Sequence, residues 1–440
     1  MVAAQRRLHR FRALIADFHR KSEMGVGFVL WDGSTVPTDL AADTAAVVIG
    51  DEGVVAALVR RPNLETLVNL WAAGRIDLRK GTLFDLVEKR PRIRTRQILD
   101  TVGRSRALGT LLSFAFVSRG GPWPLEAIAT QRSHGVADSK DDIQYHYDIS
   151  NRFYALWLDR EMVYTCGYCT DWSNDIDQIQ RDKLEMVCRK LRLKPGETML
   201  DLGCGWGALV CYAAQHYGVT AYGVTLSQRQ VDYAKEKIAR LGLETRVRIE
   251  LKDYSEVEGT YEKVASIGMH EHVGFANHAK YYASVRRSLK DGGLFLNHAI
   301  TRPAKRDQRA FRRKRPEAAL MTKYIFPGSE VDHIGNTVAG LERAGFDVHD
   351  VEGWGRHYAL TCKHWHDRLL VNYDEAVAEV GDIKARMWLA YLAGTSIAFQ
   401  RSTLGLYQTL ASKRRHPPPD FPPTRAHLYR DMGDTPAKVE

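Results

Sequence analysis

Three closely spaced glycines and an acidic residue stand together in the segment Asp201–Gly207, which reads DLGCGWG. The segment follows a short apolar run and precedes a stretch of helical periodicity that begins near Ala208. Glycines let the backbone turn tightly and approach a ligand that any Cβ atom would block. Because Gly203-x-Gly205-x-x-Ala208 satisfies the looser dinucleotide fingerprint, NAD is one ligand that this loop predicts.

S-adenosylmethionine (SAM) is the alternative ligand for this loop. In methyltransferases an acid two residues before the first glycine ends the strand, and Asp201 has that position, where it suits the cationic amine of the methionine moiety. A dinucleotide site also requires an acidic residue about 20 positions further on. The segment at that place, residues 223–227, reads GVTLS and contains no carboxylate. The two observations together favour SAM over NAD.

The loop needs a scaffold, and strand and helix patterns alternate between residues 185 and 352. The β-rich segments are residues 198–202, 221–224, 247–251, 263–267 and 293–297. This alternation predicts an α/β fold with a doubly wound, Rossmann-like sheet, which binds ligands at the carboxyl ends of its strands. Residues 353–412 are expected to be mostly helical.

The N-terminal part has a different pattern. Residues 25–88 are expected to form a small α+β unit with strands near 28–31 and 45–49, and the first 20 residues an amphipathic helix packed on it. No stretch approaches the roughly 20 apolar residues of a membrane span, and the N-terminus lacks the apolar region of a signal peptide, so an intracellular protein is expected.

We expect the chain to divide into four regions. These are an N-terminal α+β domain at 1–118, a linker at 119–145, a catalytic domain at 146–412 and a basic, proline-rich, poorly ordered tail at 413–440.

The chain is basic, with a net charge of +10 and a pI near 9.2. Lysine and arginine gather in three runs, at residues 89–106, 305–315 and 413–415. Such clustering favours a polyanionic partner, either nucleic acid or an anionic membrane surface. The six cysteines lack the spacing of a disulfide framework, and the lone pair Cys166-Gly-Tyr-Cys169 lacks the second pair of a zinc site, so no metal is expected.

Six segments in a fixed order indicate a family resemblance. They are Tyr164–Tyr168, Asp201–Gly207, Gly223–Ser227, Gly268–Gly274, His298 after the last core strand, and Lys323–Gly328. Together they resemble the cyclopropane-fatty-acid synthase family, which includes the mycolic acid cyclopropane synthases, from about Asp142 to Gln408. Residues 25–118 resemble the family's N-terminal lipid-binding domain in broad outline.

The resemblance implies a SAM site and a second site for bicarbonate. The SAM contacts, in addition to Asp201, are Tyr164, Thr165, Gly203, Gly205, Thr225, Leu226 and Gln230, with Ile267 and Gly268 beside the methionine end. The bicarbonate ligands are Cys166, Glu271, His298 and Tyr358, together with the backbone near Ile300.

The activity implied by the resemblance is that of a cyclopropane-fatty-acyl-phospholipid synthase. Its partner would be an unsaturated phospholipid in an anionic membrane surface, without nucleic acid. The enzyme would be a homo-oligomer, a dimer, in the cytoplasm and peripheral to the inner face of the membrane.

These residue types suit that chemistry. An isolated alkene is a weak nucleophile with no proton to remove, so attack on the electrophilic sulfonium methyl needs proximity and a dry pocket more than a base. Aromatic faces can stabilise the resulting carbocation. The candidate rings are Tyr145, Tyr147, Phe153, Tyr154, Trp157 and Tyr168. The added methyl must then lose a proton for ring closure; bicarbonate would be the base, held and tuned by Glu271 and His298.

Two features depart from the family pattern near the acceptor. His270 replaces an apolar or aromatic residue, and the segment between His298 and Lys323 is longer and basic. A related methyltransferase that leaves a methyl- or methylene-branched chain is therefore an alternative. A nucleic-acid methyltransferase is another, although residues 268–271 read GMHE where amino-methylating base enzymes carry Asn/Asp-Pro-Pro-aromatic. A lipid-binding protein without activity would not need the full set of bicarbonate ligands.

Overall fold

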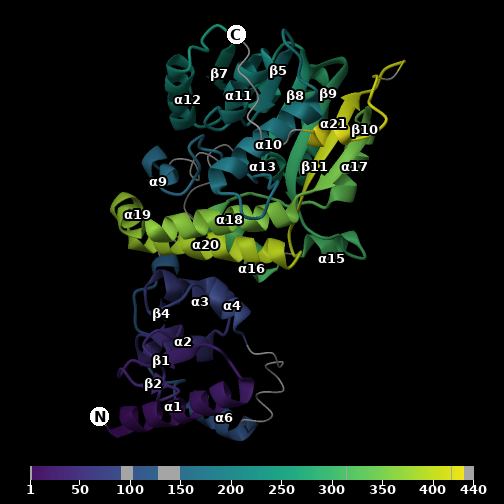
Figure 1. Ribbon diagram of the computed structural model, residues 1–440. Coiled ribbons are helices and arrows are strands. Elements are labelled where there is room, and N and C mark those ends of the chain that lie inside the picture. The colour runs from purple at the N-terminus through teal and green to yellow at the C-terminus, as the bar shows by residue number, and fades with distance from the viewer. Residues whose placement is uncertain (1, 91–102, 127–148, 314, 418, 431–440) are drawn as a thin grey trace. The chain divides into compact units, whose positions relative to one another are not determined.

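The chain forms two compact units. The computed structural model describes residues 2–90, 103–126, 149–313, 315–417 and 419–430 (Figure 1). Unit 1 consists of Met1–Val136, Arg315–Leu320 and Gly381–Gly394, and unit 2 consists of Ala137–Lys314, Met321–Val380 and Thr395–Glu440.

These boundaries differ from the expected ones because unit 1 takes two segments from the C-terminal half of the chain. Residues 119–126, expected in a linker, belong to unit 1 as well. There the buried Leu125 donates its backbone N–H to the Asn69 side chain at 3.2 Å. The rest of the expected linker, residues 127–145, lies outside the described residues.

Unit 1 is the small α+β unit that the sequence predicts. Its sheet has the order β2-β1-β3-β4, with β1 (Gly27–Val29), β2 (Thr35–Val36), β3 (Ala46–Ile49) and β4 (Ile76–Arg79). Its described helices include α1 (Val2–Ser22), α2 (Glu52–Arg60), α3 (Leu64–Ala72), α4 (Leu83–Glu88), α6 (Arg104–Leu112) and α16 (Pro316–Leu320). Helix α1 is amphipathic, as expected, and buries Phe11 and Leu14 in the core of the unit.

The segment Gly381–Gly394 is held in unit 1 by Arg386, on helix α20 (Asp382–Gln400). The Arg386 Nε donates to Trp71 O at 2.7 Å, and the Trp71 indole N–H donates to Arg386 O at 2.9 Å. The guanidinium also lies 4.5 Å from the centre of the Trp71 ring and forms an ion pair with Asp77 at 3.0 Å. Contacts between residues more than 300 positions apart therefore complete this unit.

Unit 2 contains a seven-stranded sheet in the order β10-β11-β9-β8-β5-β6-β7 (Figure 1). The strands are β5 (Thr198–Leu202), β6 (Thr220–Thr225), β7 (Val247–Leu251), β8 (Tyr261–Ile267), β9 (Leu289–Thr301), β10 (Phe346–Gly353) and β11 (Gly405–Lys413). Strands β5 to β9 pair in parallel, and the order changes direction at β5, between β6 and β8. The doubly wound α/β fold is confirmed, and ligands of such sheets bind at the carboxyl ends of the strands there.

Apolar side chains alternate between the two faces of this sheet. Met199 packs in one core with helices α10 (Ile176–Leu191), α11 (Ala208–Tyr217) and α12 (Gln228–Arg240). Leu200 points the other way, into a core with α14 (His278–Ser288) and α17 (Ile334–Arg343). Successive residues of a strand face opposite sides, so one apolar run supplies both cores.

The C-terminal half confirms one expectation and corrects another. Residues 353–412 are mostly helical, as expected, with α18 (Gly355–Val371), α19 (Tyr373–Val380) and α20, but residues 405–412 belong to β11, which pairs antiparallel with β9 and β10. His298, expected after the last core strand, lies inside β9 and opposite Gln408 of β11. An antiparallel partner thus extends the sheet beyond the parallel strands that the alternation predicts.

Residues 425–429 of the expected tail are packed within unit 2. Helix α21 (Ala426–Tyr429) contains Leu428, which is buried, and Arg425 forms an ion pair with Asp350 at 2.5 Å. Within the described residues, no helix is both long enough and apolar enough to cross a bilayer.

Candidate active site

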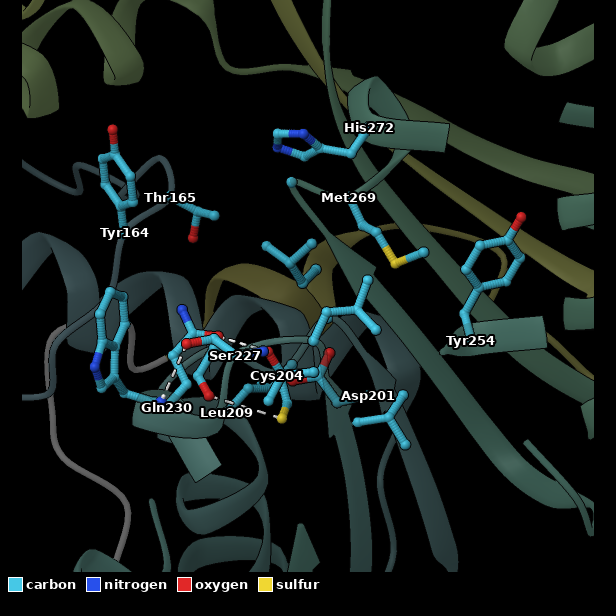
Figure 2. Close-up of a pocket in the computed structure, with 18 of the residues that line it drawn as sticks. Tyr164, Thr165, Asp201, Cys204, Leu209, Ser227, Gln230, Tyr254, Met269 and His272 are labelled. Carbon is cyan, nitrogen blue, oxygen red and sulfur yellow. Dashed lines mark hydrogen bonds between the residues drawn. The ribbon is translucent and has the colours of Figure 1, made fainter. Parts of the chain in front are cut away.

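A cavity of about 480 Å³ opens where strands β5, β6, β7 and β8 end (Figure 2). All ten residues expected to contact SAM line it: Tyr164, Thr165, Asp201, Gly203, Gly205, Thr225, Leu226, Gln230, Ile267 and Gly268. These residues come from four separate segments of the chain, and the fold brings them to one place. The volume lies in the range typical of small-molecule sites.

Glycine is required at two points of the cavity wall. Gly205 has φ +54°, and a Cβ atom built on it would meet nothing within 4 Å, so its open side faces free space. Gly268 has φ +71°, and its Cβ would lie 2.8 Å from Cγ2 of Thr165. A residue with a Cβ atom would be strained at the positive φ of both positions, and at Gly268 its Cβ would also collide with Thr165. The backbone conformation of the cavity wall therefore depends on these glycines.

The carboxyl group of Asp201 is buried in the cavity wall. Among the described residues its Oδ1 has no hydrogen-bond partner, and burial raises its pKa to about 7 while the positive charge of Lys183 opposes that rise. Lys183 lines the same cavity, and burial lowers its pKa to about 8, with Asp159 and Asp201 acting against the shift. An unpartnered buried carboxyl is suited to a cationic ligand group such as an ammonium.

The end of β6 presents neutral polar groups to the cavity. Thr225 Oγ1 donates to Gln230 Oε1 at 2.6 Å, and the Ser227 side chain caps helix α12 by accepting from the Gln230 N–H at 3.4 Å (Figure 2). The cap fixes the first turn of the helix beside the strand end. A dinucleotide site would need a carboxylate here, and hydroxyl and amide groups occupy the place instead.

The four residues expected to hold bicarbonate do not line this cavity; they gather next to it. Trp354 connects three of them. Cys166 Sγ lies 3.8 Å from Trp354 O, which also accepts the backbone N–H of Tyr358 at 3.0 Å. The His298 ring meets the Trp354 ring edge-on with centres 5.6 Å apart. The fourth, Glu271, reaches the same strand as His298, because its Oε1 accepts the backbone N–H of Ile300.

Two buried polar atoms of this second group lack partners among the described residues, Glu271 Oε2 and His298 Nε2. The backbone N–H of Gly268, which lines the cavity, donates to His298 O at 2.8 Å, so the group adjoins the methionine end of the expected SAM site. Buried polar atoms are normally hydrogen-bonded. The two unpartnered atoms of Glu271 and His298 therefore fit a small polar species such as bicarbonate. The backbone amide of Ile300, which was expected to contact that ion, donates to Glu271 instead.

The structure separates the roles of two neighbouring histidines. His270 is buried outside the cavity, with Nε2 2.7 Å from Tyr282 Oη and its ring 4.1 Å from that of His278. Burial, aided by His278, lowers the pKa of His270 to about 3, so it is neutral and serves the packing of α13 (His270–Val273). His272 lines the cavity, opposite Thr165 in Figure 2, and burial lowers its pKa to about 4.

The aromatic residues proposed for carbocation stabilisation pack behind the cavity. Of the residues named for that role, Tyr154 and Trp157 pack on Tyr164 with ring centres 5.6 and 5.2 Å away, and Phe153 packs on both. Tyr168 packs on Trp354 at 4.7 Å. Tyr145 and Tyr147 lie outside the described residues.

Sequence reasoning missed the two buried lysines of helix α10. Lys183 and Lys190 share the buried side of that helix with apolar residues such as Ile179 and Val187. A lysine on an otherwise apolar helical face is the signal that marks such a residue, since lysine is almost never fully buried unless it has a partner.

A family model described as Mycolic acid cyclopropane synthetase matches residues 134–409. The chain belongs to this family. As a member it is a SAM-dependent methyltransferase, and the matched region contains both the cavity and the adjoining polar group.

Individual relatives agree with the family. The chain is 35% identical over 408 residues to a probable fatty acid methyltransferase of Pseudomonas putida, covering 91% of this chain and 95% of the relative. It is 35% identical over 268 residues to the cyclopropane-fatty-acyl-phospholipid synthase of Escherichia coli, covering 61% of this chain and 66% of that protein. A crystal structure of a mycolic acid cyclopropane synthase with SAH and CTAB superimposes with a TM-score of 0.59 at 27% identity, covering 63% of this chain and 99% of the other.

Proposed function

We propose that this family member is a cyclopropane-fatty-acyl-phospholipid synthase, with bicarbonate as the base. The observation that carries the proposal is the pair of buried, unpartnered atoms Glu271 Oε2 and His298 Nε2 beside the methionine end of the cofactor cavity. The base of a cyclopropanation must reach the methyl group that has just been transferred, and a polar site at that end of the cavity is where such a base is needed.

The electron balance of the reaction defines what the residues must do. The π electrons of the acyl double bond form a new C–C bond to the methyl carbon, while the C–S electron pair leaves with sulfur. A proton then leaves the added methyl, and the electrons of that C–H bond close the ring on the cationic carbon. When bound, bicarbonate supplies the oxygen that accepts this proton.

The chain's own residues bind and orient these partners. Asp201 meets the ammonium of the methionine moiety, and the glycines of the loop let the cofactor approach the backbone. Glu271, whose pKa is raised to about 7 by burial, carries its proton for part of the time near neutral pH and can then donate to an anion. Cys166 contacts Trp354 O through its Sγ at 3.8 Å, and the ring of Tyr358 packs on Phe399 with centres 4.7 Å apart.

The second candidate is a methyltransferase that leaves a methyl- or methylene-branched chain. Its ground is that the relative matched over 91% of this chain is named a probable fatty acid methyltransferase, a name that specifies no ring product, whereas the cyclopropane synthase of Escherichia coli matches 61%. In this reaction the carbocation loses a different proton. His270, which departs from the family pattern, is buried away from the cavity, so His272 would be the nearer imidazole.

We further propose that the acyl chain comes from an anionic membrane surface that the protein binds from the cytoplasm. In unit 2, the run at residues 305–313 exposes Lys305, Arg306, Arg309, Arg312 and Arg313. In unit 1, Leu108, Leu112 and Phe116 follow each other at four-residue spacing and are 59, 53 and 98% exposed. Exposed apolar residues in a stripe and basic side chains suit a lipid surface.

Product analysis tests the proposal. The protein is mixed with SAM and vesicles of an unsaturated phospholipid, and the modified acyl chain is isolated. A ring resists mild catalytic hydrogenation and gives a strongly shielded methylene signal in the proton NMR spectrum, whereas a methylated olefin takes up hydrogen and lacks the signal. Mass cannot distinguish these isomers. A product that hydrogenates readily would transfer the assignment to the branching reaction, and no modified lipid at all would overturn both.

A further inference from the structure

A buried hydrogen-bonded chain ends at His298. Lys190 Nζ donates to Gln408 Oε1 at 2.8 Å, and Gln408 Nε2 lies 3.1 Å from His298 Nδ1. The three side chains come from α10, β11 and β9, and each residue is 1% exposed. Gln408 stands directly opposite His298 in the antiparallel β9–β11 ladder, so the backbone fixes the distance between them.

The chemistry of the donors settles the direction of each hydrogen bond. A lysine ammonium can only donate, so the amide oxygen of Gln408 must face Lys190 and its NH₂ group must face His298. An amide NH₂ also only donates, and therefore His298 Nδ1 must be the nitrogen without a proton. The proton of a neutral imidazole is then on Nε2. Lys190, at the other end of this hydrogen-bonded series, is itself held in place: it forms an ion pair with Glu352 and lies 5.1 Å from the centre of the Trp354 ring.

The surroundings of His298 keep its ring neutral. Burial lowers the pKa of His298 well below its usual value, and the positive charges of Lys183 and Lys190 act in the same direction. The imidazole thus has one N–H, and Nε2 has no partner among the described residues.

We propose that Lys190 and Gln408 are positioning residues that lock His298 in the Nε2-protonated tautomer, with its N–H directed at the base site. The part concerning the base site rests on the proposed function, whereas the tautomer does not. In this state His298 has no free acceptor nitrogen, because Nδ1 is bonded to Gln408. His298 therefore holds the base by donating to it, and the proton lost from the substrate goes elsewhere.

Long-range proton–nitrogen NMR on protein labelled with ¹⁵N-histidine reads the tautomer directly, without lipid, SAM or carbonate. The His298 signals are assigned by their loss in His298→Gln. We expect Nε2 protonated and Nδ1 unprotonated in the unaltered protein. A proton on Nδ1, alone or together with one on Nε2, would overturn the proposal.

Variants of Gln408 and Lys190 test the hydrogen bonds that lead to His298. In Gln408→Glu a carboxylate replaces the donor, so Nδ1 should gain a proton; in Lys190→Met the amide is released to rotate and the preference for Nε2–H should weaken. Turnover should fall roughly 10- to 100-fold while the KM for SAM changes little, as for other residues that orient an active-site histidine. Lys190→Arg keeps a cationic donor and should retain the tautomer. An unchanged tautomer in both Gln408→Glu and Lys190→Met would refute the lock.

Thr409→Val is the matched control. Thr409 is the next residue of β11, is fully buried, and points to the opposite face of the sheet. This variant tests whether a change in the strand core alone disturbs His298, and we expect neither the tautomer nor turnover to change. The tautomer is measured without substrate. A product assay that yields no cyclopropane would therefore contradict the proposed function alone, and a different tautomer of His298 would contradict the lock alone.

Discussion

Oε1 of Glu271 accepts a hydrogen bond from the backbone amide of Ile300, and the contact joins helix α13 to strand β9. The bond orients the carboxyl group so that Oε2 is left buried without a partner among the described residues. Burial raises the pKa of Glu271 to about 7, and the Ile300 hydrogen bond opposes this rise. Both protonation states are therefore accessible near neutral pH, and a protonated Oε2 together with the N–H of His298 would provide two donors for one anion.

Glu271→Gln and His298→Ala should each lose most turnover and keep SAM affinity. Both side chains lie outside the SAM cavity and would hold the base, and loss of acid–base catalysis typically lowers the rate by about 10²- to 10⁴-fold. Steady-state assays and calorimetry with SAM measure the two effects separately. His349→Ala is a control, since His349 bonds to Ser412 on the β10–β11 side of the sheet. Removing dissolved carbonate should reproduce the defect in the unaltered protein, and near-normal activity of both variants would show that the second site is misplaced.

Gly205→Val should abolish SAM binding, because the new side chain would enter the free space that Gly205 faces. Gly242→Val is matched to it: Gly242 also has a positive φ, +66°, and its Cβ would also meet nothing within 4 Å, but it lies in the turn after α12. Calorimetry should show that only the first variant loses binding. NAD should not bind to either. Equal loss in the two variants would trace the effect to backbone strain instead of the cavity.

SAM affinity should rise with pH up to about 7. Below that value Asp201 carries a proton in the free protein, because burial raises its pKa to about 7, and the ammonium of SAM favours the carboxylate. Binding therefore releases a proton. As the pH rises toward the pKa of Asp201, the dissociation constant of SAM falls by up to about tenfold per pH unit. Above about pH 8 affinity should decline as the amino group of SAM loses its charge.

Calorimetry in two buffers with different ionisation enthalpies counts that proton. Asp201→Asn should bind SAM weakly and without proton release at any pH. Proton release that persists in Asp201→Asn would assign the linkage to another group, such as Lys183.

Membrane binding should depend on salt through the exposed basic run. Neutralising Arg312, Arg313, Lys314 and Arg315 together should reduce sedimentation with anionic vesicles about tenfold or more, since each charge near such a surface contributes roughly 1 kcal/mol before screening. Residue 314 lies outside the described residues, and the other three are exposed. The control neutralises four exposed residues of unit 2 outside the basic run: Lys194, Lys235, Arg240 and Lys363. If the control variant loses as much binding, membrane binding depends on the net charge of the protein and not on the basic run.

The stripe of unit 1 should account for binding that remains at high salt. Replacing Leu108, Leu112 and Phe116 with serine removes apolar side chains that are already exposed, so the free energy of unfolding should change little. Sedimentation in high salt should then fall. High-salt binding that is unchanged in the serine variant would refute the role of the stripe.

The sequence alone determined the central sheet and its cofactor loop. Strands β5 and β7 have the predicted bounds because their patterns are local: β5 is a short apolar run, and β7, at the edge of the sheet, alternates buried Val247 and Ile249 with more exposed residues. The loop at Asp201–Gly207 could be recognised because glycines impose local backbone geometry. Eight of the ten SAM-contact residues, taken from the family resemblance, converge on one cavity because the carboxyl ends of neighbouring parallel strands share one edge of the sheet, whereas Tyr164 and Thr165 come from the segment before α10.

Tertiary structure decided what depends on partners far away in the chain. Residues 405–413 form β11 because β9 and β10 supply its hydrogen bonds on both sides. Residues 381–394 join unit 1 because Arg386 meets Trp71 and Asp77. The state of His298 is set by Gln408 and Lys190, which lie 110 and 108 positions from it along the chain. Buried polar groups take their function from the donors and acceptors packed around them, and those neighbours exist only once the chain has folded.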